Sequence, residues 1–215
     1  MSSDTAIIMI DMHNTYLADD GFRERMGYPA IWRLEETIEQ CRLMMEAARA
    51  QGIPIIYTRS VKRKDRADYL PRIETVLSRA LDGWTGRGPE YELWKRELIA
   101  DVAPQDGDYV VDKGRWCSFT HTELEPILKN LGISRLIVAG LQTNVCVETT
   151  VRSALMKNYI VAVPEDAVST DGEDLHHNSL KAMKILYTEV APWRELLDPS
   201  IPWTRATDDP HYGRG

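Results

Sequence analysis

Short apolar runs alternate along the chain with longer segments in which apolar residues recur at three- and four-residue steps. The runs cover residues 6–10, 53–58, 108–112, 136–140 and 159–163. Nearly continuous apolar runs of this length are typical of strands that a parallel sheet buries on both faces. The helical spacing covers residues 30–51, 121–130, 143–157 and a segment from about Leu175. Because strands and helices alternate, we predict an α/β fold with a doubly wound, mostly parallel sheet and helices on both faces.

The length of the chain fits one domain. Its 215 residues are 43% hydrophobic, which is enough for one sizeable core rather than two. We place this domain at residues 1–197 and a C-terminal tail, which contains three prolines and two glycines, at residues 198–215. Residues 59–107 are the least regular stretch, and so long an irregular segment in a compact domain is usually a lid or an interface.

Ionisable residues stand at the ends of two predicted strands. Asp11 ends the first strand, and Lys113 follows the third. Carboxyl ends of parallel strands share one edge of the sheet, and open α/β folds bind ligands at this edge. The turn after the fourth strand reaches the same edge and leads to Cys146. Asp11 alone could also cap the turn that follows it, but three complementary groups at one edge favour a catalytic site.

Cys146 falls in the first turn of the helix predicted at 143–157. Thr143 is a candidate N-cap, because its hydroxyl can accept a hydrogen bond from a first-turn N–H. The unpaired N–H groups and the positive end of the helix dipole favour a thiolate at this position. We therefore predict a cysteine nucleophile that faces an anion site. The alternative interpretation is a small buried cysteine that fills the helix face.

The remaining chemistry-bearing residues near these motifs have structural interpretations as well. His13 follows Asp11 by two residues and can hydrogen-bond Asp11, bind a metal or pack in the loop. Cys41 falls on the apolar face of the helix predicted at 30–51 and is expected in the core. Cys117 is interpreted as a packing residue rather than a second nucleophile. Three cysteines are an odd number without metal-like spacing, which indicates a reducing compartment.

Composition and charge narrow the class of partner. The chain has 26 Lys and Arg against 33 Asp and Glu, and the net charge of 26 − 33 = −7 argues against a nucleic-acid partner. The N-terminal residues carry no basic segment followed by a long apolar run, so we expect no secretion signal and no membrane span. The cytoplasm is the expected location.

Three motifs, in order along the chain, resemble those of the isochorismatase-like cysteine hydrolases. They are Ile8-Met9-Ile10-Asp11-Met12, Val111-Asp112-Lys113 and Gly140-Leu141-Gln142-Thr143-Asn144-Val145-Cys146-Val147. The resemblance covers residues 5–197 and implies a six-stranded Rossmann-like sheet with a catalytic triad of Asp11, Lys113 and Cys146. It also implies a cis peptide bond at Leu141–Gln142, with the N–H groups of Gln142 and Cys146 forming an oxyanion hole.

Other segments are similar to the biuret hydrolases and their triuret-cleaving relatives within this family. They are Gly21-Phe22-Arg23-Glu24-Arg25-Met26-Gly27-Tyr28, then Tyr57-Thr58-Arg59 with Asp65, Ala67 and Asp68, and Ser118-Phe119 before Thr122. Residues 143–148 are also similar to the ureidoacrylate amidohydrolases. The resemblance implies cleavage of a C–N bond in a linear ureide such as triuret or biuret, with release of ammonia through a covalent cysteine intermediate. Ureidoacrylate, N-carbamoyl amides, and other amides or hydrazides are alternative substrates, and a non-catalytic α/β binding domain is the alternative from another class.

The resemblance also bears on cofactors and partners. Nicotinamidases of the superfamily bind a metal through Asp and His residues after the second strand, whereas no His lies between His13 and His121 here, so we expect no metal and no cofactor. The expected partners are a small ureide, water and further copies of the chain in a homodimer or homotetramer. A ureide needs hydrogen-bond partners along its length, because each unpaired amide in a dry pocket costs about 1–3 kcal/mol. The candidates for these hydrogen bonds, by position, are Asn14, Arg59, Arg115, Gln142 and Tyr187. Tyr16, Trp116 and Phe119 are the candidates for the apolar wall of the substrate pocket.

Overall fold

The computed structural model describes residues 4–17, 27–61, 67, 89–186 and 188–203. These residues form a central sheet of seven strands, and every recorded pairing between the strands is parallel. The strands are β1 (Thr5–Ile10), β2 (Ile55–Ser60), β3 (Tyr109–Lys113), β4 (Arg135–Leu141), β5 (Ile160–Pro164), β6 (Val168–Ser169) and β7 (Glu189–Ala191). Six of them follow the order β3-β2-β1-β4-β5-β7, and the two-residue β6 pairs with the end of β4. The predicted parallel sheet is therefore confirmed, and the two-residue β6 adds a seventh strand to the six that the family resemblance implied.

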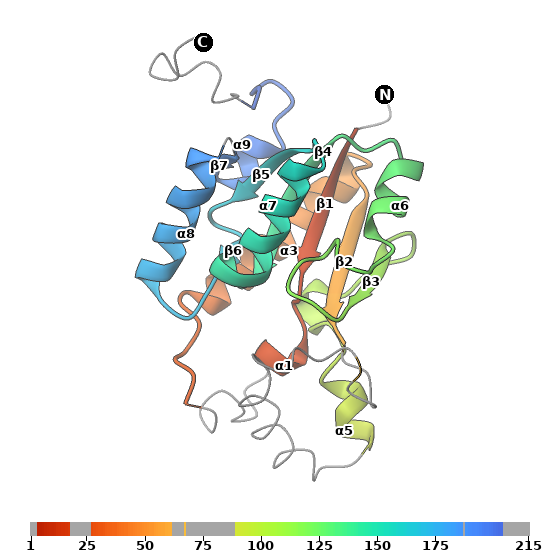
Figure 1. Cartoon of the computed structure of the whole chain (residues 1–215), viewed down its shortest axis with the longest axis vertical. Coiled ribbons are helices and arrows are strands. Elements are labelled where there is room, and N and C mark those ends of the chain that lie inside the picture. The colour runs from red at the N-terminus through yellow and green to blue at the C-terminus, as the bar shows by residue number, and fades with distance from the viewer. Residues whose placement is uncertain (1–3, 18–26, 62–66, 68–88, 187, 204–215) are drawn as a thin grey trace.

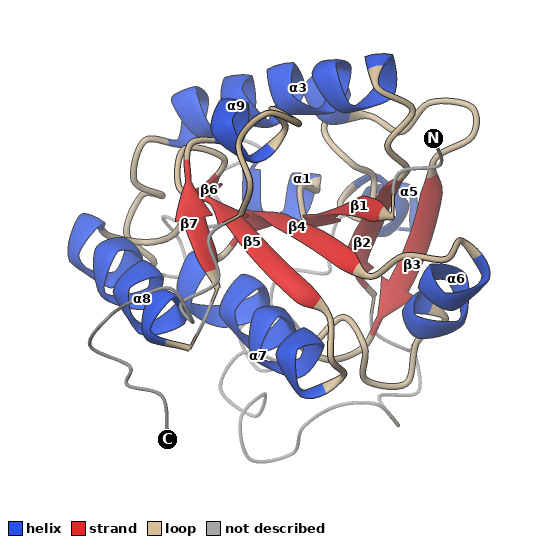
Figure 2. Ribbon diagram, turned by 90° about the horizontal axis from the view of Figure 1, so that it is seen from above, coloured by secondary structure: helices blue, strands red, loops and turns tan. Residues whose placement is uncertain are grey.

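Alternate residues of β1 enter two different cores, one on each face of the sheet. Ala6, Ile8 and Ile10 pack in one core, which we call the first core, whereas Ile7 and Met9 pack in the other, which we call the second core. Because side chains of a strand alternate between faces, a continuous apolar run requires both faces to be covered. Figure 2 shows these covering layers, with α3 (Leu34–Ala50) and α9 (Trp193–Leu196) on one face of the sheet and α6 (Leu124–Asn130), α7 (Glu148–Met156) and α8 (Glu173–Ile185) on the other.

The helix predicted from residue 30 begins four residues later, at Leu34. Arg33 has a φ of 49°, and this left-handed conformation keeps the preceding residues out of the helix. At the other end, Gly52 follows the last turn with a φ of 71°, as expected of a glycine that terminates a helix. Cys41 is fully buried on the inner face of α3, which confirms its predicted place in the core.

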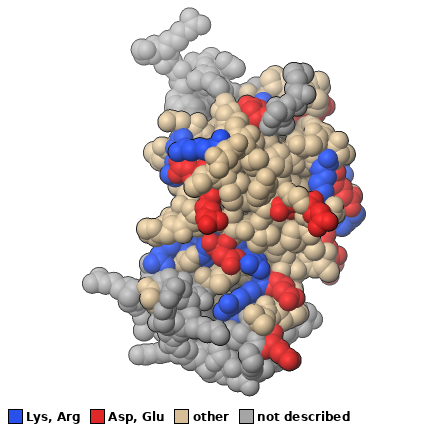
Figure 3. Space-filling view, turned by 90° about the vertical axis from the view of Figure 1, so that its right-hand side faces the viewer, with Lys and Arg blue, Asp and Glu red and all other residues tan. Residues whose placement is uncertain are grey.

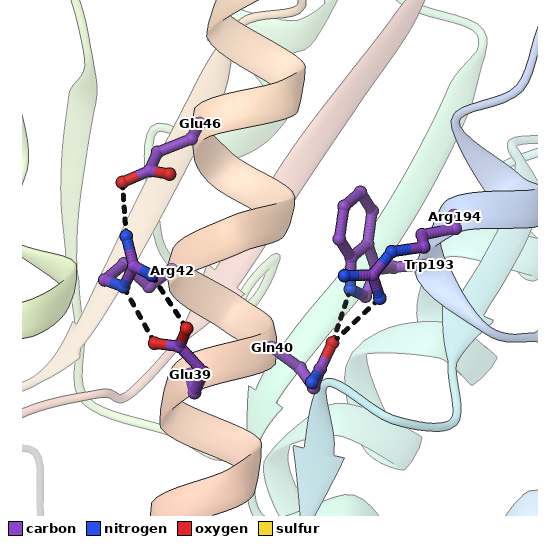
Figure 4. Close-up of polar contacts among 6 residues, drawn as sticks. All are labelled: Glu39, Gln40, Arg42, Glu46, Trp193 and Arg194. Atoms are coloured by element: carbon purple, nitrogen blue, oxygen red, sulfur yellow. Dashed lines mark hydrogen bonds and ion pairs between the residues drawn. The ribbon is translucent and has the colours of Figure 1, made fainter.

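Polar contacts join α3 to α9 beside the second core (Figure 4). Gln40 Oε1 accepts hydrogen bonds from Trp193 Nε1 at 2.9 Å and from Arg194 Nη1 at 3.1 Å. On the exposed side of α3, Arg42 pairs with Glu39 and Glu46. Because exposed ion pairs contribute about 1 kcal/mol or less, apolar burial is the main force that holds α3 against the sheet.

The described part of the irregular stretch begins at the carboxyl edge of the sheet and then packs along α3. It contains α5 (Pro89–Trp94) and a 3₁₀ turn (Ala100–Val102), and Figure 1 shows α5 and α1 (Asn14–Leu17) beyond the ends of β1 and β2. The N–H of Asn14 donates to Glu97 O, and the N–H of Ile99 donates to Met12 O, both at 3.0 Å. These bonds fix the chain that follows β1, where the sequence predicts functional residues.

The beginning of the predicted tail packs at the opposite, amino edge. Trp203 Nε1 donates to Leu196 O at 3.1 Å, and the Arg135 guanidinium lies 4.1 Å from the centre of the Trp203 ring. Residues 204–215 of that tail lie outside the described residues. None of the helices in the described ranges has the length and apolar character needed to cross a membrane. On the face seen in Figure 3, acidic and basic side chains are interspersed.

Candidate active site

The strand order places the switch point of the sheet between the carboxyl ends of β1 and β4. These strands are neighbours, but the long helix between β1 and β2, α3, covers one face of the sheet, and the helix after β4, α7, covers the other. A sheet of this kind binds ligands where its connections diverge in this way. Asp11 follows β1 directly, and Cys146 lies in the turn that follows β4. The predicted convergence of these two residues therefore has a topological cause.

Lys113 reaches this switch point from the edge strand β3. Because β2 separates β3 from β1, the two backbones lie about 10 Å apart at the usual strand spacing of about 4.8 Å. The long Lys113 side chain crosses this distance, and its Nζ lies 2.7 Å from Asp11 Oδ2 and 3.5 Å from Cys146 Sγ. The structure thus brings the three predicted catalytic residues together.

The Asp11–Lys113 ion pair is shielded from water and held on both sides. Both side chains have 0% exposure. Lys113 Nζ also donates to Arg115 O at 3.1 Å, and Thr58 Oγ1 donates to Asp11 Oδ1 at 3.1 Å. Buried charges need such additional hydrogen bonds because they have lost their contacts with water.

Burial controls the charge of the sulfur. It raises the pKa of Cys146 to about 12, and the charge of Asp11 adds to this rise while Lys113 opposes it. For Lys113, burial works against the charged form, but Asp11 and Cys146 outweigh it and raise its pKa above the ordinary value. The resting pair therefore consists of a neutral thiol and a charged ammonium, so the predicted resting thiolate is wrong.

The backbone around the sulfur differs from the predicted regular helix. Residues 143–157 form one turn of π-helix (Thr143–Val147), which we call the π-turn, followed by α7. In the π-turn the N–H of Val147 donates to Gln142 O at 3.2 Å. The peptide bond Leu141–Gln142 before it is cis, which confirms that prediction. Single π-turns within helices are frequent at functional sites.

Thr143 is not the N-cap that the sequence indicated. Gln142 precedes the π-turn without a capping side-chain hydrogen bond, and Thr143 itself is the first residue of the turn. The Thr143 side chain is fully buried, and its Oγ1 lies 3.1 Å from His176 Nδ1 on α8. The sequence prediction failed here because the turn begins one residue earlier and points Thr143 inward.

A glycine allows β4 to approach β1 just before the cis peptide. Gly140 pairs with Ile10 and has a φ of 100°. A Cβ at this position would lie 2.3 Å from Ile10 O and 2.8 Å from Ile10 N, distances that a backbone cannot accommodate without moving. Only glycine fits, and its place in the motif of the fourth strand follows from this close approach.

His13 lies beside the ion pair and is neutral. Its side chain is only 1% exposed, and burial lowers its pKa to about 4, although Asp11 acts in the opposite direction. A backbone bridge with Leu98 holds its segment. Of the three interpretations, the structure therefore favours a packed, neutral imidazole near Asp11. No group of three or more His, Cys, Asp and Glu side chains in the described ranges is arranged to hold a metal ion.

Three of the predicted substrate-binding side chains are engaged with protein groups. Arg59 Nε pairs with Asp112 Oδ1 at 2.7 Å across neighbouring strands, and Asn14 Nδ2 donates to Trp94 O at 2.9 Å. Gln142 Nε2 donates to Asp171 Oδ1 at 2.5 Å. The amide of Asn14 joins α1 to the last residue of α5, and its contact with substrate stays a prediction. Gln142 lies directly before the π-turn, and its contact with substrate stays a prediction as well.

The loop after Lys113 contributes mainly through its backbone. The Arg115 carbonyl receives the Lys113 ammonium, while Arg115 Nη1 donates to Gly114 O at 3.0 Å. Trp116 is 45% exposed. Cys117 is half-buried and packs against the first core, as predicted for a packing residue.

Phe119 lies away from the position that its prediction required. Its ring stacks on Tyr159 at 5.8 Å, and Lys157 Nζ lies 5.6 Å from its centre. Both partners lie at the C-terminal end of α7. At 1.5 Å per residue, this end is about 15 Å from the π-turn at the other end of the helix. The prediction that Phe119 walls the substrate pocket is therefore wrong. The side chain of Tyr16 and the whole of Tyr187 lie outside the described residues.

Three residues that the sequence analysis did not select contact the site. Thr58 donates a hydrogen bond to Asp11, His176 of α8 contacts Thr143, and Ser179 of α8 contacts Glu148 beside the π-turn. The sequence could have indicated a buried His176, because His176 lies at helical spacing from Leu180 and Met183 on the inward face of α8. Two cavities of about 360 and 240 Å³ lie at the amino edge of the sheet and beside α3, and neither is lined by the triad.

Comparisons with known proteins agree with this geometry. The family described as Isochorismatase domain matches residues 5–195. A ureidoacrylate amidohydrolase of Agrobacterium fabrum is 32% identical over 181 residues, which cover 80% of this chain and 78% of that protein. The solved structure of a cysteine hydrolase from Pseudomonas syringae pv. phaseolicola superposes with a TM-score of 0.77 at 26% identity, covering 90% of this chain and 91% of that chain. N-carbamoylsarcosine amidase from Thermoplasma acidophilum superposes with a TM-score of 0.64 at 26% identity, covering 88% and 96%.

Proposed function

This chain belongs to the isochorismatase family, and we propose that it is a cysteine amidohydrolase that removes ammonia from a small carbamoyl amide. The observation that carries the proposal is the buried contact of Lys113 with both Asp11 and Cys146 at the switch point of the sheet. A carboxylate, an ammonium and a thiol within reach of one another are the parts needed for a base-activated nucleophile.

The proposed first step is transfer of the Cys146 proton to Asp11. The transfer is required because the pKa of the buried thiol is about 12, so the thiol is neutral near pH 7. Lys113 stays charged and stabilises the thiolate electrostatically from 3.5 Å. A general base beside the sulfur and a fixed cation together compensate for the cost of making a thiolate in a dry site.

The proposed chemistry then follows in two halves. The thiolate adds to the carbamoyl carbon, and the oxyanion is stabilised by the N–H groups of Gln142 and Cys146. As the C–N bond breaks, Asp11 returns its proton to the nitrogen, and ammonia leaves a thiocarbamate on Cys146. Water then attacks this carbon, giving its proton to Asp11, and the C–S bond breaks as the sulfur regains a proton. The released carbamate loses carbon dioxide.

The proposed substrate carries a terminal carbamoyl group on a short planar chain. Support comes from the names of the relatives, since both ureidoacrylate amidohydrolase and N-carbamoylsarcosine amidase name substrates with this group. Triuret and biuret share the group and remain the substrates implied by the motifs of residues 21–28 and 57–59. Two polar pairs beside the π-turn, Gln142 with Asp171 and Asn144 with Thr170, are candidates to recognise the rest of the chain.

The experiment is a substrate panel in which released ammonia is measured for the amides and released hydrazine for the hydrazides. The purified protein is incubated with ureidoacrylate, N-carbamoyl amino acids, biuret and triuret on one side, and with nicotinamide, aryl amides and aryl hydrazides on the other. We expect ammonia release from at least one carbamoyl amide and none from nicotinamide. Hydrolysis confined to aryl amides or hydrazides would reject the substrate class while leaving the cysteine mechanism in place.

A further inference from the structure

Helix α8 packs against the π-turn through two polar side chains on one of its faces. His176 and Ser179 stand three residues apart, a spacing that places them on the same side of a helix. Both are buried, with exposures of 2% and 5%. Buried polar groups on an otherwise apolar face require partners, and here the partners belong to the turn that carries Cys146.

His176 contacts the first residue of the turn. Its Nδ1 lies 3.1 Å from Thr143 Oγ1, and its ring lies 4.9 Å from that of Trp32 in a tilted arrangement. Burial lowers the pKa of His176 to about 4, with His177 and Arg33 acting in the same direction. The imidazole is therefore neutral near pH 7, so Nδ1 can accept the hydrogen of the Thr143 hydroxyl.

Ser179 contacts both ends of the turn. Its Oγ lies 2.6 Å from Glu148 Oε2 and 3.2 Å from Thr143 O. The single hydroxyl hydrogen points to the shorter, charged partner, because hydrogen bonds to carboxylates are the stronger kind. Glu148 is held from its other side by Arg152 at 2.7 Å. Cys146 thus lies between two residues that α8 holds.

We propose that His176 and Ser179 are positioning residues that hold the π-turn, and with it Cys146, in place for attack on the substrate. This inference rests on the proposed function for its catalytic consequence, but the holding itself is a property of the fold. A π-turn is one residue wider than an α-turn, and contacts from α8 oppose its relaxation to the commoner geometry. A displacement of about 1 Å at a nucleophile can cost on the order of 100-fold in rate.

The test compares His176→Leu with His176→Asn and with the matched control His177→Leu. Leucine removes the contact with Thr143, whereas asparagine keeps a polar atom near the place of Nδ1. His177 is the next residue on α8, and its side chain is 60% exposed. We expect His176→Leu to lower kcat by roughly 10- to 100-fold with KM within about twofold, His176→Asn to recover most of the loss, and His177→Leu to remain near the wild-type rate.

Hydrogen exchange supplies the second readout, independent of substrate. In His176→Leu we expect faster exchange of the amides of residues 143–148 and unchanged exchange in β1 and β4. Thr143→Val should reproduce both effects, and the double variant should be no worse than the poorer single variant. If His176→Leu does not fold, Thr143→Val and Ser179→Ala decide the question.

Three outcomes would overturn the inference. The first is unchanged hydrogen exchange of the π-turn in the variants. The second is faster exchange with an unchanged kcat, and the third is a loss of activity that appears only in KM, because a positioning role predicts a lower kcat. If the protein hydrolyses an aryl amide and no carbamoyl amide, the proposed substrate class fails, while the same variants assayed on the aryl amide still decide the inference.

Discussion

Replacing Lys113 with Met tests whether the buried ion pair has the energetic role that its geometry implies. Methionine has a similar length but no charge, so the variant leaves the Asp11 carboxylate without its cation at a site of 0% exposure. Removing one partner of a buried ion pair costs about 3–5 kcal/mol, because the remaining charge has neither water nor a counter-ion. Asp11 keeps the hydrogen bond from Thr58 at 3.1 Å, which offsets part of this cost.

The assay is urea unfolding followed by circular dichroism near pH 7. We expect Lys113→Met to lower the free energy of unfolding by about 3–4 kcal/mol, and the double variant Asp11→Asn with Lys113→Met to recover most of the loss because it removes the stranded charge. A loss below about 1 kcal/mol, or a double variant no more stable than Lys113→Met, would refute the reasoning.

Two further predictions concern the backbone and the histidines. Gly140→Ala combines a left-handed φ with a backbone clash against Ile10, so it should lower the free energy of unfolding by about 2–6 kcal/mol. The control Gly132→Ala has a φ of 70° with open space around it and should lower the free energy of unfolding by only about 1–2 kcal/mol. Equal thermal stability of the two variants would contradict this prediction. Burial lowers the pKa of His13 and of His176 from 6.5 to about 4, so as the pH falls through this range the unfolded chain binds protons that the folded chain does not. Stability should therefore fall by up to about 3 kcal/mol for each histidine, from 2.5 units at 1.36 kcal/mol per unit. His176→Asn should remove part of this pH dependence of the free energy of unfolding. If the variant shows the same pH dependence as the wild type, the prediction is wrong.

The sequence predicts the positions of Asp11, Lys113 and Cys146 because strand ends are visible in the pattern of apolar runs. A parallel sheet brings these ends to one edge, whatever the details of packing. The same rule brings Lys113 to this edge but does not give its distance from Asp11. The contact between the two side chains depends on the strand order, which the structure supplies.

The protonation of Cys146 could not be predicted from its place near a helix start. Helix dipole arguments favour a thiolate, but they assume an exposed first turn. In the structure the sulfur is buried beside the Asp11 carboxylate, and desolvation outweighs the dipole. Burial is set by residues that are distant in the sequence, and local spacing does not reveal it.

Phe119 and His176 show the limit of assignment by position along the chain. Phe119 follows a catalytic strand closely, yet it stacks on Tyr159 at the far end of α7. His176 lies 30 residues beyond Cys146, yet it contacts the π-turn. Loops can carry a residue away from the strand end before them, whereas a helix returning along the sheet can bring a distant residue back.

The most direct test of the central claim is ammonia release from the preferred substrate by Cys146→Ser beside Cys117→Ser. Cys117 is half-buried in the neighbouring loop and provides a matched control for loss of a thiol. The account predicts that Cys146→Ser loses at least about 1,000-fold in kcat while folding normally, and that Cys117→Ser keeps activity within about threefold of the wild type. Retention of activity in Cys146→Ser, or its loss in Cys117→Ser alone, would contradict the role of Cys146 as the nucleophile.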